Sequence, residues 1–162
     1  MLAGGGGSLY EFVDEFMKAH PQAGGLGVNW CIFGSSGHTT KPEGGVLENY
    51  TMRAEDDFCK NRHIKTICDP SKVLGIISVH FPIYRKGLYN LNEAGTVIHG
   101  TFTDAVHFSK IRINHYFTKS FEEFMAKRSR GMADHLSGIR SMHDFDDHDQ
   151  NVIHDTEILS RV

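Results

Sequence analysis

Residues 111–124 read IRINHYFTKSFEEF and decide where a strand gives way to a helix. Ile111 and Ile113 alternate with a polar residue, which is the period of a half-buried strand. Ser120 is followed three residues later by Glu123, and this spacing is a capping box that starts a helix. The segment therefore predicts a strand that leads directly into a helix.

Four polar residues, Asn114, His115, Tyr116 and Lys119, lie between this strand and this helix. A strand end that meets a helix N-terminus is a common anion site, because the free N–H groups and the helix dipole favour negative charge. A neutral imidazole is also a common ligand of divalent ions. A lone histidine is nevertheless more often a structural residue, and a single lysine is more often a surface charge, so the residues alone leave both roles open.

The rest of the chain alternates predicted strands and helices, which favours an α/β fold class. Residues 1–7 form a flexible glycine-rich start, and residues 8–162 are expected to form a single domain. The acidic run 144–149 does not match the spacing of a calcium-binding loop and is interpreted as a solvated loop. The predicted strands are 26–33, 76–81 and 111–114, and the predicted helices are 8–19 and 120–133.

Composition excludes several classes of protein. The 162 residues are 40% hydrophobic and carry a formal net charge of −3, which argues against a nucleic-acid-binding surface. No apolar run reaches about 18 residues, so no transmembrane segment is expected. Residues 1–8 lack the basic and apolar regions of a signal peptide. We therefore expect a cytoplasmic location and leave membrane association open for a longer protein.

The cysteines and histidines do not form a recognisable metal motif. Three cysteines are too few for a disulfide framework, and no two have C-x-x-C spacing. The eleven histidines are scattered and include no H-x-x-x-H pair. A histidine-rich zinc protein is therefore the least favoured of the functions considered.

A second candidate region is the small-residue loop 34–38, which follows a predicted strand. Small residues allow a backbone to approach a ligand closely, although the same residues also make a simple tight turn. Glu43 and Glu48 follow this loop, and either could act as a general base. A solvated glutamate is the more common role for both.

Three blocks of sequence, taken together, resemble a known family. They are residues 25–38 (GLGVNWCIFGSSGH), residues 42–53 (PEGGVLENYTMR) and residues 114–134 (NHYFTKSFEEFMAKRSRGMAD). In this order they resemble the C-terminal half of bacterial-type glycosyltransferases of family 92 and the family-2-like group. The resemblance covers residues 8–159.

The resemblance implies a partial GT-A fold, the C-terminal portion of a Rossmann-like glycosyltransferase. Such enzymes bind a nucleotide-sugar through an Asp-x-Asp motif and a divalent metal, Mn²⁺ or Mg²⁺, and transfer the sugar to a hydroxyl of a carbohydrate acceptor. This sequence has no Asp-x-Asp before its glycine-rich start, so we expect the donor-binding half to be missing and the chain alone to hold no cofactor. Two functions stay open: a glycosyltransferase, or a catalytically inactive fragment that at most binds sugar or a partner. An exposed face left by the missing half would favour self-association.

The resemblance also implies roles for individual residues. The metal ligand would be His115, and the base that deprotonates the acceptor hydroxyl would be Glu43. The residues expected to line the acceptor pocket are Trp30, Ser35, Ser36 and His38. The residues expected near the donor diphosphate are Asn114 and Lys119.

Overall fold

The computed structural model describes residues 2–3, 8–131 and 138–161. It divides the chain into two compact units. The first unit contains Met1–Cys31 and Asp56–Asn114, and the second contains Ile32–Glu55 and His115–Val162. The architecture is mixed α/β with an open sheet, as the sequence predicts, while the finer GT-A assignment stays a prediction.

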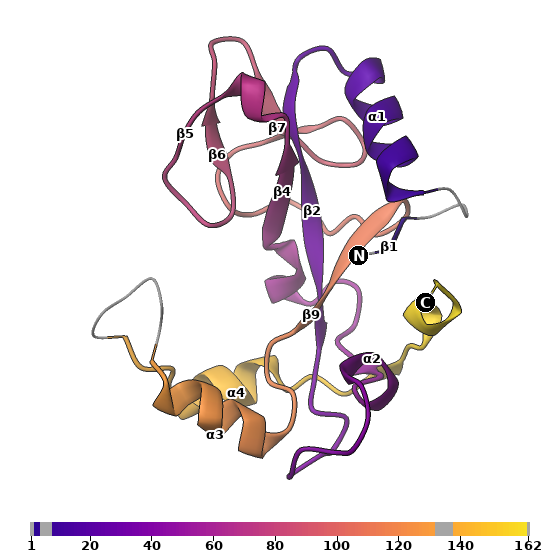
Figure 1. The fold of residues 1–162 in the computed structure, drawn as a ribbon, viewed down its shortest axis with the longest axis vertical. Helices are drawn as coiled ribbons and strands as arrows, with labels where there is room; N and C mark the ends of the chain where they lie inside the picture. The colour runs from indigo at the N-terminus through magenta and orange to yellow at the C-terminus, as the bar shows by residue number, and fades with distance from the viewer. Residues whose placement is uncertain (1, 4–7, 132–137, 162) are drawn as a thin grey trace. The chain divides into compact units, whose positions relative to one another are not determined.

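The first unit is built on strand β2 (Ala23–Phe33), whose residues are buried along its whole length and whose last two residues belong to the second unit (Figure 1). Strand β4 (Ile64–Cys68) pairs with β2 in the antiparallel direction and β7 (Tyr89–Leu91) pairs with it in the parallel direction, so the sheet is mixed. The remaining elements of this unit are β1 (Leu2–Ala3), α1 (Leu9–Ala19), η1 (Cys59–Arg62), η2 (Pro70–Lys72), β5 (Val73–Ile76), β6 (Pro82–Tyr84), β8 (Val97–Ile98) and β9 (Ile111–Tyr116), which continues into the second unit.

Helix α1 supplies one side of the core of the first unit. It begins after a capping box in which the Ser8 hydroxyl accepts from the Glu11 backbone N–H at 3.1 Å. Phe16 of α1 is buried in a cluster with apolar residues of the sheet, among them Leu26 and Ile111. The predicted helix at 8–19 and the predicted strands at 26–33 and 111–114 are therefore confirmed.

The start of β9 is held by a buried carboxylate that the sequence did not single out. Glu93 is 4% exposed and its carboxylate accepts the backbone N–H groups of Ser109, Lys110 and Ile111 at 2.8–3.0 Å. Three N–H donors on one carboxylate fix the direction in which β9 leaves its preceding loop. This anchor matters because β9 leads to the polar residues between strand and helix.

The predicted strand at 76–81 is wrong in its position. The structure has an antiparallel hairpin of β5 and β6 instead, and residues 77–81 connect the two strands. Pro82 begins β6 rather than ending a strand. The inner face of the hairpin packs through Tyr84 on the backbone of Gly24 and Gly25, where a Cβ atom would lie 2.3 Å from the Tyr84 side chain.

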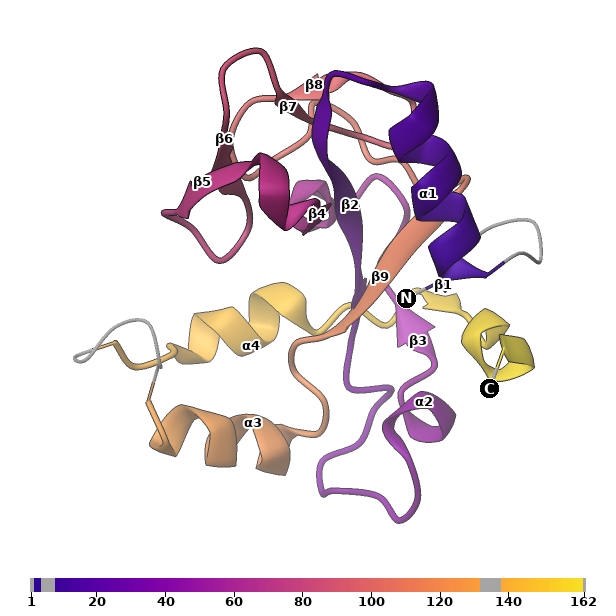
Figure 2. The ribbon, with the colours of Figure 1, turned by 45° about the horizontal axis from the view of Figure 1, so that its top comes forward.

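The second unit contains the α-helices α2, α3 and α4 (Figure 2). Its helix α3 begins directly after Ser120, as predicted, but ends nine residues later at Ser129 rather than near residue 133. Gly131 has a φ of +75°, a left-handed backbone that does not continue a helix, and residue 133 lies outside the described residues. The elements of this unit are α2 (Val46–Asn49), β3 (Met52–Arg53), α3 (Phe121–Ser129), α4 (Met142–His148), β10 (Ile153–His154) and η3 (Glu157–Arg161).

The prediction of a solvated loop at 144–149 is also wrong, because most of this run lies in α4. Ser141 and Asp144 form a capping box that starts the helix. Phe145 then packs edge-on against Phe121 and Phe124 of α3, with ring centroids 5.4 and 5.2 Å apart, and Figure 2 shows the two helices side by side. The acidic side chains occupy the outer positions of a helix whose other face is aromatic.

No helix among residues 8–131 and 138–161 is long and apolar enough to cross a bilayer.

The contact between Tyr84 and β2 predicts how a small substitution affects the first unit. Gly24→Ala places a methyl group within 2.7 Å of three ring atoms of Tyr84, so it should lower the free energy of unfolding by about 1–3 kcal/mol. Gly75→Ala in β5 is the matched control, because nothing lies within 4 Å of its added Cβ. Chemical denaturation of both variants measures the difference, and equal stabilities would contradict the packing.

Candidate anion-binding site

A pocket of about 500 Å³ lies in the second unit, where the end of β9 leads into α3. Four cationic residues line it: Lys41, Lys119, Lys127 and Arg130. A single carboxylate, Glu123, accompanies them among the lining residues. The pocket therefore carries an excess of positive charge and suits an anionic ligand.

The N-terminus of α3 is not the anion site that the sequence predicts, because its N–H groups are engaged. Protein oxygens accept from each of the first N–H groups of the helix and from the capping residue. The donor and acceptor pairs are Ser120 N with Tyr50 Oη (3.1 Å), Phe121 N with His38 O (3.2 Å), Glu122 N with Thr39 O (2.9 Å) and Glu123 N with Ser120 Oγ (3.2 Å). An anion would have to displace one of these oxygens, so the structure favours binding along the side of α3.

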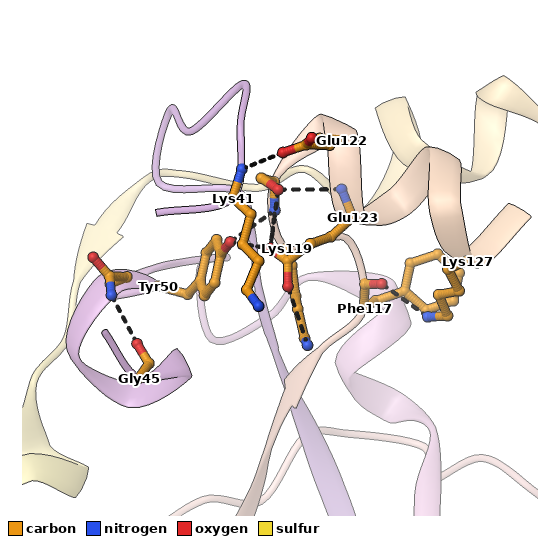
Figure 3. Close-up of polar contacts among 10 residues, drawn as sticks. Lys41, Gly45, Tyr50, Phe117, Lys119, Glu122, Glu123 and Lys127 are labelled. Atoms are coloured by element: carbon orange, nitrogen blue, oxygen red, sulfur yellow. Dashed lines mark hydrogen bonds and ion pairs between the residues drawn. The ribbon is translucent and has the colours of Figure 1, made fainter. Parts of the chain in front are cut away.

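A three-residue hydrogen-bond network fixes the wall of the pocket (Figure 3). The Tyr50 hydroxyl and the Ser120 hydroxyl both donate to Oε2 of Glu123, the latter at 2.9 Å. Burial raises the pKa of the Glu123 carboxyl, but the hydrogen bonds from Tyr50 and Ser120 outweigh burial and hold the pKa below its ordinary value. Burial and the bond to Glu123 raise the pKa of Tyr50. Glu123 is thus an ionised structural acceptor.

Lys119 is positioned by an unusual backbone. Its φ of +54° lies in the left-handed region, which a lysine rarely adopts. Its Nζ lies 3.4 Å from Oε1 of Glu123, and its side chain is 38% exposed. The structure therefore places Lys119 at the mouth of the pocket, in agreement with an anion-binding role but without testing that role.

Thr118 contributes a buried hydroxyl to the lining. The residue is 1% exposed, and Oγ1 has no hydrogen-bond partner among the residues that the structure describes. A buried hydroxyl without a partner costs free energy, so a ligand oxygen in the pocket would be a favourable acceptor.

Lys127 is the most perturbed cation of the pocket. Its Nζ donates to the Phe117 carbonyl oxygen at 2.9 Å and lies 4.2 Å from the centre of the Phe117 ring. Burial, together with repulsion from Arg140, Lys119 and Arg130, lowers the pKa of Lys127 to about 8. The ammonium is therefore charged at neutral pH and loses its proton more readily than an ordinary lysine.

The loop 34–38 was predicted to line an acceptor pocket. Its polar side chains instead form hydrogen bonds within the loop and with neighbouring residues of the second unit. The Ser35 hydroxyl accepts from Gly37 N at 3.2 Å, and the Ser36 hydroxyl accepts from Met52 N at 3.0 Å. The His38 ring lies 3.2 Å from the Asn49 carbonyl oxygen through Nε2. The His38 carbonyl oxygen also accepts from Phe121 N at the start of α3, so the loop has a structural role, and its acceptor role stays a prediction.

The other predicted site residues lie outside the pocket lining. Trp30 belongs to the first unit, where it is 8% exposed and stacks on His63 with ring centroids 4.6 Å apart. Glu43 is an exposed loop residue whose carbonyl oxygen accepts from the Asn49 side chain at 2.8 Å. Asn114 accepts from Nε of Arg112 at 3.1 Å in β9. The roles inferred for these residues are neither supported nor contradicted by these contacts.

His115 lies at the end of β9, with its ring 5.9 Å from that of Phe117. No group of three His, Cys, Asp or Glu side chains suited to a metal occurs in the described part of the chain. The metal role of His115 stays a prediction.

Sequence reasoning missed Lys41 and Thr118 and did not assign a role to Lys127 or Arg130. Lys127 and Arg130 are three positions apart on and just after α3, so a helical projection from the capping box could have placed them on one side. Lys41 reaches the site through the loop, where its backbone N–H donates to Glu122 at 2.7 Å. No local pattern links residues that are 81 positions apart.

Comparisons of this chain with protein-family models, with curated proteins and with solved structures find no match. The basis for a functional proposal is therefore the pocket together with residues 114–134, the block that supplies most of its lining.

The network around Glu123 predicts a clear stability effect. Tyr50→Phe removes a donor to Glu123 and leaves the buried N–H of Ser120 only its longer bond to Glu123 Oε2 (3.4 Å), so it should lower the free energy of unfolding by about 1–3 kcal/mol. Tyr10→Phe is the control, because Tyr10 is 78% exposed. Urea denaturation distinguishes them, and a Tyr50→Phe protein as stable as the control would show that the network is not a structural centre.

Proposed function

We propose that this chain acts in a glycosyltransferase that moves a sugar from a nucleotide-sugar donor to a hydroxyl of a carbohydrate acceptor. In this proposal the pocket beside α3 holds the diphosphate of the donor. The observation that carries it is the convergence of Lys41, Lys119, Lys127 and Arg130 on one pocket. The resemblance of residues 114–134 to the glycosyltransferase block gives this charge a specific ligand.

Each cation suits phosphate oxygens in a different way. The guanidinium of Arg130 offers a planar fork that can engage two oxygens at once. Lys41 and Lys119 are compact charges on flexible stems, which can follow a ligand as it enters. Lys127 is partly buried against Phe117, where a charge interacts more strongly than in water.

The carboxylate of Glu123 offsets only part of this attraction. Its Oε2 is already occupied by the hydroxyls of Tyr50 and Ser120, and its Oε1 lies 3.4 Å from Lys119. The carboxylate therefore belongs to the wall of the pocket. The four cations minus this one carboxylate leave a formal charge of +3 for a ligand.

In sugar transfer, the bond between the sugar and the diphosphate breaks and negative charge grows on the leaving diphosphate. Cations placed around that group stabilise the transition state more than the ground state. Lys119, Lys127 and Arg130 would serve this purpose. The Thr118 hydroxyl would donate to one of the diphosphate oxygens, which would give this buried group a hydrogen-bond partner.

Other parts of the reaction are proposed from the resemblance alone. Glu43 would accept the proton of the acceptor hydroxyl, and Trp30, Ser35, Ser36 and His38 would contact the acceptor. His115 would join carboxylates around Mn²⁺ or Mg²⁺, which supplies further charge neutralisation when bound.

Nucleoside diphosphate binding tests the pocket directly. By isothermal titration calorimetry, the chain should bind a nucleoside diphosphate more tightly than the corresponding nucleoside, with an affinity that falls as salt rises. Lys119→Gln combined with Arg130→Gln should weaken binding at least about tenfold, because charge-assisted hydrogen bonds are lost. Lys18→Gln on α1 is the control, since Lys18 is an exposed cation of the first unit.

Equal affinity for the nucleoside and the diphosphate, or an unchanged affinity in the double variant, would overturn the proposal for this pocket. Binding without sugar transfer to any acceptor would instead favour the catalytically inactive module.

Lys127 gives the binding a pH dependence with a defined sign. The charged ammonium attracts the ligand, so affinity should be highest below pH 8 and should fall as pH rises through the pKa of about 8. The terminal phosphate of a nucleoside diphosphate has a second pKa of about 6, so it gains little charge above pH 7 and a fall in affinity at higher pH reports the protein. Lys127→Arg should keep its affinity up to about pH 9, because a guanidinium stays charged. Titrations at pH 7, 8 and 9 measure this, and a parallel decline in Lys127→Arg would exclude Lys127 as the titrating group.

A further inference from the structure

The hairpin of β5 and β6 in the first unit exposes a row of large aliphatic side chains. Their exposed fractions range from 42% to 78%. They are Leu74, Ile76, Ile77, Val79 and Ile83. Single exposed aliphatic residues are common on protein surfaces, but five on one short hairpin form a patch that calls for a binding partner.

The geometry of the hairpin keeps these side chains out of the core. Exposure alternates along β5, so Leu74 and Ile76 point away from the protein while Val73 is partly buried. Exposure also alternates along β6, where Ile83 is exposed between buried Pro82 and partly buried Tyr84, so Ile83 lies on the outer face of its strand. The inner face is already packed through Tyr84. The outer face has no described element over it.

The segment 70–92, which contains the hairpin, carries cations only, and Asp69, which attracts Lys72, borders it. No aspartate or glutamate occurs between Asp69 and Glu93, although the chain contains 20 acidic residues. The cations of this segment are Lys72, Arg85 and Lys86. Arg85 and Lys86 follow β6 and are exposed. Lys65 of β4 also reaches the turn, where its Nζ donates to the Val79 carbonyl oxygen at 2.9 Å.

We propose that this hairpin docks the protein peripherally on an anionic lipid surface. The outer aliphatic side chains would enter the boundary between headgroups and acyl chains, and Arg85 and Lys86 would pair with lipid phosphates and carboxylates. Buried apolar area and attraction to anionic lipid add together in such binding. This inference depends on the first unit alone and not on the function proposed for the pocket.

Charge complementarity selects lipid over a second copy of this chain. If two copies met through this face, a two-fold axis would bring the same patch together from both sides. Both surfaces would then carry Arg85 and Lys86, and residues 70–92 of neither copy would supply an acidic side chain to pair with them. An anionic bilayer supplies the apolar layer and the opposite charge in one surface.

Co-sedimentation with vesicles tests the proposal. The chain should bind vesicles of phosphatidylcholine mixed with phosphatidylserine and should bind pure phosphatidylcholine at least about tenfold more weakly. Ile76→Ser with Ile77→Ser should remove binding, and Arg85→Gln with Lys86→Gln should weaken it about tenfold or more, because each cation contributes about 1 kcal/mol near such a surface. The controls are Val152→Ser, which removes an aliphatic side chain that is 56% exposed in the second unit, and Lys18→Gln.

Three results would overturn the inference. The first is no binding to anionic vesicles by the unmodified chain. The second is equal loss of binding in the controls and in the hairpin variants, which circular dichroism would separate from unfolding. The third is a dimer in light scattering that Ile76→Ser with Ile77→Ser converts to a monomer, without vesicle binding, because the patch would then be an interface between copies. The arginine and lysine variant alters only exposed side chains, so it stays informative if the isoleucine variant misfolds.

Discussion

The bond from the Tyr50 hydroxyl to the Glu123 carboxylate is the interaction on which the second unit and its pocket depend. It joins the end of α2 to the first turn of α3, and Ser120 completes it from the capping position. Glu123 is held by these partners, and among the pocket cations it pairs with Lys119 through Oε1 at 3.4 Å. Because backbone oxygens of the 34–41 loop close the first N–H groups of α3, the helix terminus is sealed and the positive charge that remains available comes from side chains.

The aromatic packing beneath the pocket extends this constraint to Lys127. Phe117, whose ring and carbonyl oxygen hold the Lys127 ammonium, stacks on His148 of α4 with centroids 3.9 Å apart. Phe145 of the same helix packs on Phe124. Helix α4 thereby holds the ring that keeps Lys127 partly buried, and burial is the main cause of its lowered pKa. Helix α4 contributes no residue to the pocket lining, but its packing on Phe117 influences the pKa of Lys127 on α3.

The sequence predicted the helices whose starts depend on hydrogen bonds between residues close together in the chain. The capping boxes at Ser8 and Ser120 located α1 and α3, since a cap satisfies backbone groups within one turn. The third cap, at Ser141, was missed because an aspartate replaces the glutamate and because acidic composition suggested a loop. Among the pocket residues, the sequence predicted a role for Lys119, which directly precedes the capping residue Ser120. Lys41 and Tyr50 could not be placed, because long-range folding brings them to α3 and no spacing in the sequence encodes that contact.

The central claim is that an anion binds along the side of α3 and not at its sealed N-terminus, and amide chemical shifts test it most directly. In a ¹⁵N-labelled sample titrated with a nucleoside diphosphate, the largest shifts should fall on Thr118, Lys119 and Lys127. The amides of Phe121 and Glu122 should move little, because their partners are the carbonyl oxygens of His38 and Thr39. If the largest shifts instead fall on Phe121 and Glu122, the ligand has displaced those oxygens and the account is contradicted.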